Sequence, residues 1–382
     1  MILRGSFLKW WSGRKLVRVE TSCIGNMVDV SSRALPETRQ PGPIPRTVLK
    51  KLLFIADVMW EDNELVPELA KICEVRSLDL RPALRNQSYE NPAAAPQAVL
   101  RSVEGFLADP RSSNADAVLF YARGALLSCE VFDLLRKACS GPIIGMNLDD
   151  KANFWPCNAY SDGGDHYRRW VNSFDLNLTN SRIASTWYRE AGATCRYSPP
   201  AMRRHPQLTM PTNADFKYPL SFVGSVKLER EIIVAKLRDA NIPVALFGNG
   251  WPDSKWEPDT TAIYRSSQIN LGLGLATPNL ATMKNRDFEC PGAGACYLTT
   301  FNWELAEWWE IGKEILCYRN IEELVEIFCW YRNRPQDCLA IAQAAWKRAD
   351  REHTWEVRFR DIFKDLGFDR KILCGNHGLQ VP

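Results

Sequence analysis

The sequence is poor in the residues that hold metals and in the spacings that metal sites need. It has only four histidines in 382 residues, and none stands at a metal-ligand spacing from another. Its twelve cysteines form no Cys-x-x-Cys pair and are scattered singly through apolar stretches. That pattern is typical of small buried side chains in a reduced compartment. We therefore predict no metal site and no disulfide framework.

Other absences narrow the class of protein. No run of eighteen apolar residues is present, so we expect no membrane-spanning helix and a cytoplasmic chain. The net charge of +3 is far below that of a dedicated nucleic-acid binder. A content of 46% hydrophobic and 24% charged residues is that of a globular protein, and the length favours two domains. No Gly-x-Gly-x-x-Gly follows an early strand, which argues against an NAD-dependent oxidoreductase.

Short apolar runs alternate with amphipathic segments from residue 50 onward. In the first half this alternation predicts strands at 52–56, 117–122 and 143–146, and helices at 66–73 and 131–138. Strand, helix and strand in this order indicate a parallel sheet with crossover helices.

This alternation of strand and helix patterns stops at 197–219, where five prolines indicate an interdomain linker. It then restarts. In the second half we expect strands at 220–223, 244–247, 269–271, 297–299 and 315–318, and helices from residue 229, at 324–331 and at 359–366.

Two α/β units joined by a proline-rich linker predict two facing Rossmann-like domains. Ligands of such domains bind outside the carboxyl ends of the strands. The expected divisions are an extension over 1–47, an N-terminal domain over 48–205, a C-terminal domain over 206–355, and a closing helix and tail over 356–382.

The strand expected at 220–223 ends in Gly224 and Ser225, with Arg230 in the helix that follows. Backbone N–H groups at the start of that helix can bind a phosphate. An ordinary tight turn between strand and helix would have the same pattern.

A second glycine-rich turn follows the strand at 244–247 and contains Gly248, Asn249, Gly250 and Trp251. The glycines allow close approach of the backbone, and the indole could stack on a base or a sugar. The alternative is a turn whose aromatic ring folds onto the surface.

The densest segment, 285–299, begins Asn-Arg-Asp-Phe-Glu and continues through two glycines. Arg286 and Glu289 are three apart and share a helix face. A guanidinium suits a diphosphate, and a carboxylate suits the hydroxyls of a ribose. Gly292 and Gly294 would turn the chain back into a strand. An exposed ion pair between the two side chains is the alternative.

Asp149 and Asp150 follow the strand at 143–146. Adjacent carboxylates at the carboxyl end of a strand are suited to a general base, because each raises the pKa of the other. The alternative is a capping aspartate at the start of a helix. His166 is the competing candidate for the base.

In their order, these motifs resemble the C-terminal domain of the CgeB-like, spore-maturation glycosyltransferases of the GT-B class. The likeness runs from about residue 220 to 363. It includes Phe-Val-Gly-Ser with Arg230, Phe-Gly-Asn-Gly-Trp, and the run from Tyr264 that contains Asn270. It continues through Asn285-Arg-Asp-Phe-Glu and ends at His-Thr-Trp-Glu-Val-Arg, residues 353–358. The match is looser before residue 201, and the first strand lacks the glycine-rich loop of many GT-B enzymes.

The resemblance implies an α/β GT-B fold whose last helix crosses back onto the N-terminal domain. The C-terminal domain would bind a UDP- or GDP-type sugar donor, with Arg286 on phosphate, Glu289 on ribose and residues 248–251 on the base. The N-terminal domain would bind an acceptor, which could be a glycan, a lipid, a protein or a nucleic-acid base. No cofactor or metal is implied, because basic side chains and helix N-termini offset the leaving diphosphate. A non-catalytic nucleotide- or sugar-binding protein is the rival, and only turnover of a nucleotide sugar separates the two.

The first 47 residues are expected to lie outside both domains. Pro36, Pro41, Pro43 and Pro45 interrupt any helix or strand there. Residues 1–20 contain two tryptophans and four basic residues, which could give weak contact with an anionic membrane surface. The alternatives are a disordered tail or a start at Met27.

Deletion of residues 1–47 should therefore leave folding and hydrolysis of a soluble donor intact. Circular dichroism and a donor-hydrolysis assay on the truncated chain check this. A truncated chain that fails to fold would show that the segment packs as part of the N-terminal domain.

Overall fold

The structure is a computed structural model that describes residues 47–57, 64–84, 94–121, 123–155, 167–205, 207–212, 216–255, 257, 259–277 and 280–368. All but the last residue of the extension expected at 1–47, with the expected membrane contact of residues 1–20, lies outside these residues, and so does His166. No described helix is both long and apolar enough to cross a membrane.

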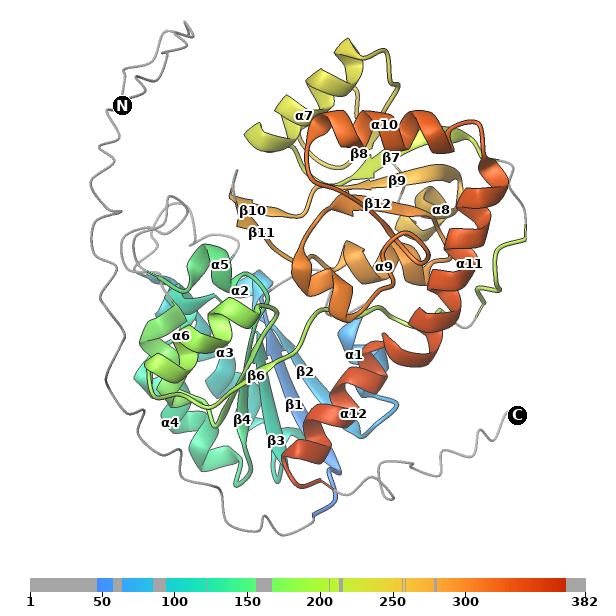
Figure 1. Ribbon diagram of the computed structural model, residues 1–382. Helices are drawn as coiled ribbons and strands as arrows, with labels where there is room; N and C mark the ends of the chain where they lie inside the picture. Colours follow the sequence, from blue (N-terminus) through green and yellow to red (C-terminus); the bar gives the residue numbers. More distant parts are fainter. Residues whose placement is uncertain are drawn as a thin grey trace, which may run out of the picture. The chain divides into compact units, whose positions relative to one another are not determined.

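The first half is a six-stranded parallel sheet in the order β2-β1-β3-β4-β5-β6 (Figure 1). The strands are β1 (Lys51–Ala56), β2 (Glu74–Asp79), β3 (Ala117–Tyr121), β4 (Ile143–Asn147), β5 (Leu176–Thr179) and β6 (Cys195–Tyr197). Its helices are α1 (Leu65–Leu69), α2 (Arg81–Leu84), α3 (Ala95–Ala108), α4 (Cys129–Ala138), α5 (Asp150–Asn153) and α6 (Arg182–Glu190).

The second half is a five-stranded parallel sheet in the order β13-β12-β9-β7-β8, with a separate two-stranded pair, β10 and β11. The strands are β7 (Tyr218–Val223), β8 (Ala245–Phe247), β9 (Ser267–Gly272), β10 (Leu275–Thr277), β11 (Leu280–Ala281), β12 (Tyr297–Thr300) and β13 (Leu316–Tyr318). The helices are α7 (Leu228–Asp239), α8 (Thr260–Arg265), α9 (Arg286–Gly292), α10 (Ile321–Tyr331), α11 (Pro335–Glu352) and α12 (Trp355–Asp365).

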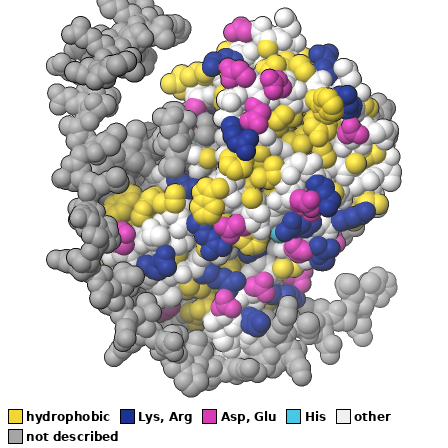
Figure 2. All heavy atoms as spheres, viewed as in Figure 1, with side chains coloured by type: hydrophobic (Ala, Val, Ile, Leu, Met, Phe, Trp, Pro, Cys, Tyr) yellow, Lys and Arg dark blue, Asp and Glu magenta, His cyan; other side chains and the backbone are white. Residues whose placement is uncertain are grey.

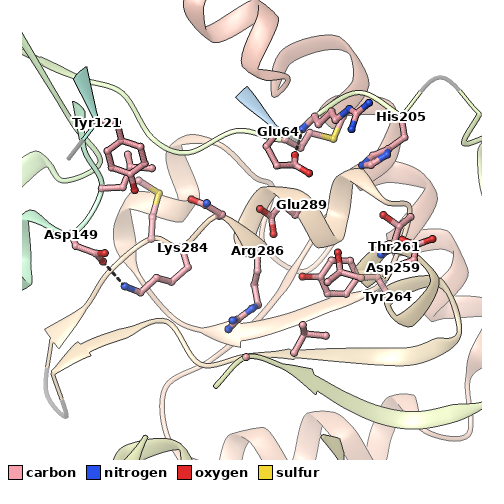
Figure 3. A pocket seen from close by; sticks show the side chains of 18 residues that line it. Glu64, Tyr121, Asp149, His205, Asp259, Thr261, Tyr264, Lys284, Arg286 and Glu289 are labelled. Carbon is pink, nitrogen blue, oxygen red and sulfur yellow. Dashed lines mark hydrogen bonds and ion pairs between the residues drawn. The ribbon is translucent and has the colours of Figure 1, made fainter. Parts of the chain in front are cut away.

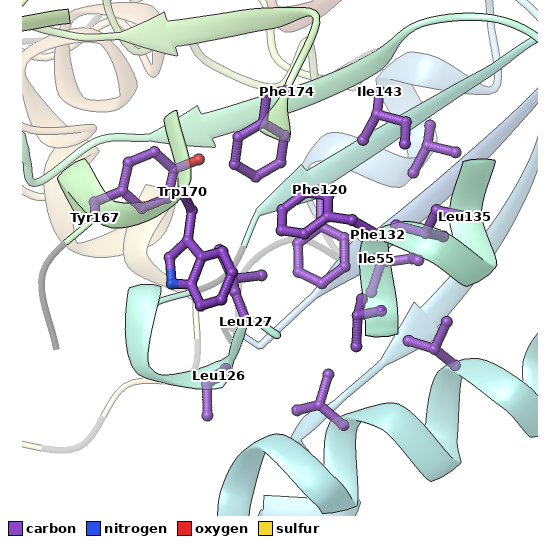
Figure 4. Close-up of a cluster of buried hydrophobic side chains, with 14 of the residues drawn as sticks. Ile55, Phe120, Leu126, Leu127, Phe132, Leu135, Ile143, Tyr167, Trp170 and Phe174 are labelled. Atoms are coloured by element: carbon purple, nitrogen blue, oxygen red, sulfur yellow. The ribbon is translucent and has the colours of Figure 1, made fainter. Parts of the chain in front are cut away.

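The central strands of the first sheet are buried on both faces, as their unbroken apolar sequences require. Alternate residues of β1 and β3 enter two separate cores. The core beneath α3 and α4 is rich in aromatic rings, and the Phe132 ring lies 5.0 Å from that of Phe174 (Figure 4). The other core is closed by α12.

Helix α12 is the last described helix of the chain, yet it packs on the first sheet (Figure 1). Trp355, Phe359, Ile362 and Phe363 form one buried face, and they lie against core residues of β1 and β3. The Thr354 hydroxyl accepts the Val357 N–H at the start of the helix. The closing helix that crosses back, implied by the family resemblance, is confirmed.

Two connecting segments run between the halves, and their backbones hydrogen-bond to each other. The Met202 N–H donates to His353 O at 2.9 Å, and the Trp355 N–H donates to Met202 O at 2.9 Å. Thus the linker that leads from the first half to the second contacts, at Met202, the segment that leads back to α12.

A buried ion pair joins the halves elsewhere. Lys151 Nζ of α5 lies 2.9 Å from Glu304 Oε2, in a 3₁₀ turn after β12, and the two side chains are 3% and 0% exposed. The other carboxylate oxygen of Glu304 accepts the Arg182 N–H, and Lys151 also donates to Ala281 O at 2.8 Å. Both charges are therefore held by additional hydrogen bonds, as a buried pair requires.

Most expected elements are present within a few residues. Several observed elements were not expected, among them α3, α6, α8, α11, β2, β5 and β6. Strand β2 is a polar edge strand, so no apolar run marks it. Helix α11 contacts α9, and most of its buried side chains, including Ala342, Ala345 and Ala349, are small. The helix expected at 66–73 ends at Leu69, because β2 already begins at Glu74.

Lys151→Met should destabilise the protein by about 3–5 kcal/mol, because it leaves the Glu304 carboxylate buried without its cation. Adding Glu304→Gln should restore much of that loss, since the amide oxygen can still accept the Arg182 N–H. Urea unfolding of the single and double variants measures both effects.

The matched control is the exposed pair of Lys313 and Glu310, 66% and 58% exposed. Lys313→Met should change the free energy of unfolding by less than about 1 kcal/mol. Equal losses at Lys151 and Lys313 would contradict the role assigned to the buried pair.

Candidate active site

A cavity of about 760 Å³ opens where the carboxyl ends of the two sheets meet (Figure 3). Leu148 and Asp149 follow β4, Tyr121 ends β3, and Val223 ends β7. The linker contributes three further side chains to the wall. The remaining lining residues are Glu64, Met202, Arg203, His205, Gly224, Asp259, Thr260, Thr261, Tyr264, Met283, Lys284, Asn285, Arg286 and Glu289. A cavity therefore lies at the edge of the sheets where the topology predicted a ligand.

Helix α9 brings Arg286 and Glu289 to the cavity. The buried carboxylate of Asp287 accepts the Lys284 N–H at 2.7 Å and the Tyr297 hydroxyl at 2.7 Å, which holds the first turn of the helix in place. Arg286 and Glu289, three residues apart, then both line the cavity, as their spacing predicted (Figure 3).

Arg286 and Arg230 meet at Gly224. A side-chain carbon built on Gly224 would lie 2.7 Å from Arg286 Nη2 and 3.3 Å from Arg230 Nη1, so glycine makes room for both guanidinium groups. Arg286 and Arg230 lie over the ring of Phe222, at 5.0 and 5.5 Å. Neither guanidinium has an ion pair with a carboxylate among the described residues, and Nε and Nη1 of Arg286 are buried without a hydrogen-bond partner there.

The charge of Arg286 affects the pKa of its neighbour Arg230. Burial, and then the positive charge of Arg286, lowers the pKa of Arg230 to about 10. Arg230 donates to Ser225 O at 2.7 Å, which is a neutral acceptor. Although burial opposes it, the nearby tyrosines and the carboxylates of Asp287 and Glu289 raise the pKa of Arg286. Neither carboxylate forms an ion pair with either guanidinium, and an anion at Gly224 would give both groups a direct partner.

The turn at 248–251 does not line the cavity. The Trp251 indole is 7% exposed, donates to Gly224 O at 2.7 Å and packs on Phe222. Asn249 O accepts the Val226 N–H, and Gly248 lies directly against the Gly224 backbone. The turn formed by Gly248, Asn249, Gly250 and Trp251 thus packs against the Gly224 turn and does not reach the cavity. This corrects the expectation that Trp251 faces the ligand.

Other predicted residues support the cavity from behind it. Asn270 is buried in β9, where its amide donates to Tyr264 O at 3.0 Å. Gly292 gives space to Met202, whose sulfur would be 1.9 Å from a side-chain carbon there. Gly294 has a φ of 77° and ends α9.

Asp149 and Asp150 are separated by the structure. Asp149 lines the cavity and pairs with Lys284 Nζ at 2.9 Å (Figure 3). Although burial opposes it, the Lys284 charge keeps the pKa of Asp149 below its usual value. Asp150 is 1% exposed and accepts hydrogen bonds from Asn147 and the Tyr188 hydroxyl, both at 2.7 Å. Asp150 is therefore part of the buried core of the first half, which corrects its assignment as a base facing the ligand.

The carboxylate of Glu64 was missed by the sequence reasoning. Glu64 precedes α1 and accepts the Arg203 N–H at 3.2 Å, so the linker holds it at the cavity wall. Burial raises the pKa of Glu64 to about 7, against the lowering effect of Arg203. Burial, and then the negative charge of Glu64, raises the pKa of Glu289 to about 8. Only the position of Glu64 opposite α9 distinguishes it from an ordinary helix-starting acid.

Lys284 and His205 were also missed, because neither belongs to a recognisable motif. Lys284 precedes α9, and His205 lies in the linker, which the sequence reasoning treated as a spacer. Burial and the charge of Arg203 lower the pKa of His205, which favours its neutral form. Among the described residues, no group of three or more His, Cys, Asp or Glu side chains is placed to hold a metal ion.

Glu64→Gln should flatten the pH dependence of stability. An unfolded glutamate ionises near pH 4.5, whereas Glu64 in the folded protein stays protonated until about pH 7. The folded state binds more protons in this range, so its stability falls as the pH rises from 4.5 through 7. Glutamine does not titrate, so the variant should not lose this stability. Relative to the wild type, its free energy of unfolding should increase by on the order of 1–3 kcal/mol between pH 5 and pH 8.

Urea unfolding of both proteins at pH 5 and pH 8 measures this difference. Glu322→Gln, on the exposed side of α10, is the control and should track the wild type at both pH values. A constant difference between Glu64→Gln and the wild type at the two pH values would refute the raised pKa.

Comparisons with known proteins agree with this architecture. The Glycosyl transferase-like family matches residues 230–364. No curated protein sequence matches the chain. The chain is similar in structure to the sucrose-phosphate synthase of Thermosynechococcus elongatus, with a TM-score of 0.55 and 9% identity over 83% of this chain and 99% of that one.

Two further solved structures are similar. HepE of Anabaena, in complex with UDP and glucose, has a TM-score of 0.53 and 14% identity over 83% of this chain and 99% of its own. TarM has a TM-score of 0.52 and 9% identity over 72% of this chain, and the match spans only 58% of TarM. The chain therefore has the GT-B fold, with a glycosyltransferase-like C-terminal region.

Proposed function

We propose that this protein is a glycosyltransferase that moves a sugar from a nucleoside-diphosphate sugar to an acceptor. The observation that carries the proposal is the pair of guanidinium groups at Gly224, which have no carboxylate partner among the described residues. They lie at the carboxyl end of β7, at the point where the strand order of the second sheet reverses. This is where doubly wound sheets bind nucleotides.

The donor would bind mainly to the second half. Its diphosphate would lie at Gly224 and accept hydrogen bonds from Arg286, while Glu289 would bind the ribose hydroxyls. The base, of the uridine or guanosine type, would occupy the part of the cavity lined by Thr261 and Tyr264. The UDP bound to the similar HepE structure supports a uridine donor. The arginine charge would offset the leaving diphosphate without a metal ion.

The acceptor would enter from the first half. Asp149 is a weak base, because its pairing with Lys284 favours the ionised carboxylate. It is suited to binding an acceptor hydroxyl. Glu64 has the pKa that a general base needs, and it would take the acceptor proton as the new bond to the anomeric carbon forms and the bond to the diphosphate oxygen breaks.

The CgeB-like subtype, a cytoplasmic location and contact of residues 1–20 with a membrane are parts of this proposal that rest on the sequence. A panel of UDP- and GDP-sugars, assayed for release of the nucleoside diphosphate, tests the central claim. Binding of a nucleoside diphosphate without any turnover would instead favour a nucleotide-binding protein of the same fold.

Arg286→Gln should weaken the binding of UDP or GDP by about 1.5–3 kcal/mol, the contribution of a hydrogen bond to a charged group. Isothermal titration calorimetry on the full-length protein measures it. Arg319→Gln is the control, because Arg319 is an exposed arginine of the same half that pairs with Glu323. An unchanged nucleotide affinity in Arg286→Gln would show that the diphosphate does not bind at Gly224.

A further inference from the structure

A second cavity of about 370 Å³ lies at the junction of the two halves, and it shares no lining residue with the first. Residues of β6 and α12 form its wall on one side, and the turn after η5 (Trp303–Glu307) and the end of α11 form the other. Four arginines line it: Arg196, Arg348, Arg351 and Arg358.

Arg358 is the unusual member of this set. It is only 8% exposed, and its guanidinium has no hydrogen bond or ion pair with any other described residue. Its carbon lies 4.4 Å from the ring centre of Trp308 and 5.9 Å from that of Phe288. The aromatic rings fix the guanidinium plane, but they satisfy none of its five N–H donors.

The other arginines of the cavity already have partners. Arg348 and Arg351 pair with Glu352, and Arg196 pairs with Asp365. Glu307, also in the wall, pairs with Arg182 outside it. The carboxylate of Asp361 is within 4.0 Å of no described cation, Arg358 included.

The anion-binding character of the cavity rests on Arg358. Glu314 and Asp365 also pair with Arg348 and Arg196, and Arg182 pairs with Glu307, so the charges in and around the wall balance and only Arg358 and Asp361 have no ion pair among the described residues. His353 adds no charge near neutral pH, because burial and the charge of Arg358 lower its pKa to about 4. On the face shown in Figure 2 acidic and basic side chains are interspersed, and no broad basic surface is seen there.

We propose that this second cavity is a binding site for a phosphate monoester, whose phosphate oxygens accept hydrogen bonds from Arg358. A guanidinium fork matches two oxygens of such a group, and the phosphate would remove the cost of a buried charge without a partner. The cavity volume exceeds that of phosphate alone, which leaves room for a small organic group. Because both halves line the cavity, bound phosphate would also stabilise their junction.

The test uses the full-length protein carrying Arg286→Gln, so that anion binding in the first cavity is weakened, and the effect of Arg358 is read as the difference from this protein. Inorganic phosphate and glycerol phosphate are titrated by calorimetry, with sodium chloride at equal ionic strength as the reference. We expect saturable binding of both phosphates and a rise in the melting temperature. Adding Arg358→Gln should weaken binding at least tenfold and abolish the rise, whereas the exposed-residue control Arg332→Gln should do neither.

If Arg358→Gln does not fold, Arg358→Lys serves in its place, since it keeps the charge but loses the two-pronged geometry, and it should also weaken binding. Phosphate binding that is no stronger than that of chloride in the Arg286→Gln protein would overturn the proposal. So would binding that Arg358→Gln leaves unchanged. Loss of stability without loss of phosphate binding would show that Arg358 only packs against Trp308.

Discussion

The cavity exists because two separate sheets are held at a fixed junction. The buried pair of Lys151 and Glu304 lies at that junction, with both charges held by further hydrogen bonds to the opposite half. The pairing of Met202 with the backbone around Thr354 joins the two connections between the halves. A buried ion pair adds little net stability but tolerates no loss of a partner. It therefore specifies one arrangement of the halves, and every distance across the cavity depends on that arrangement.

The charges of the cavity are divided between the halves. The second half places the unpaired guanidinium of Arg286 beside Gly224, with Arg230 behind it, and the first half contributes Glu64 and Asp149. Lys284 connects the two sets through its pair with Asp149. This division suits a reaction in which an anionic leaving group departs on one side and a proton is taken up on the other. It also explains why the carboxylates differ, since the pKa of Asp149 is held down by its cation while that of Glu64 is raised by burial.

Local sequence was a good guide wherever a residue interacts with its own element. The alternation of apolar runs and helical faces predicted both parallel sheets, and the spacing of Arg286 and Glu289 predicted that they share a face. It failed where the partner is distant. Trp251 could as well have faced a ligand, and only the hydrogen bond to Gly224 O assigns it to the support of the turn. Helix α11 was not predicted although Cys338, Ala342, Ala345 and Ala349 lie on one face at helical spacing, because these side chains are small.

The α/β class, the parallel sheets, the edge at which the cavity opens, and the arginine and glutamate of α9 that line it could all be predicted from the sequence. These follow from periodicity and from the geometry of a single turn or helix, which are short-range. That Asp149 faces the cavity while its neighbour Asp150 is buried depends on the tertiary fold. The same is true of Glu64, brought opposite Glu289 from 225 residues away, and of Arg358, enclosed by rings of the other half. Burial and the charges of distant residues set the chemistry of these groups, and both arise only when the two halves come together.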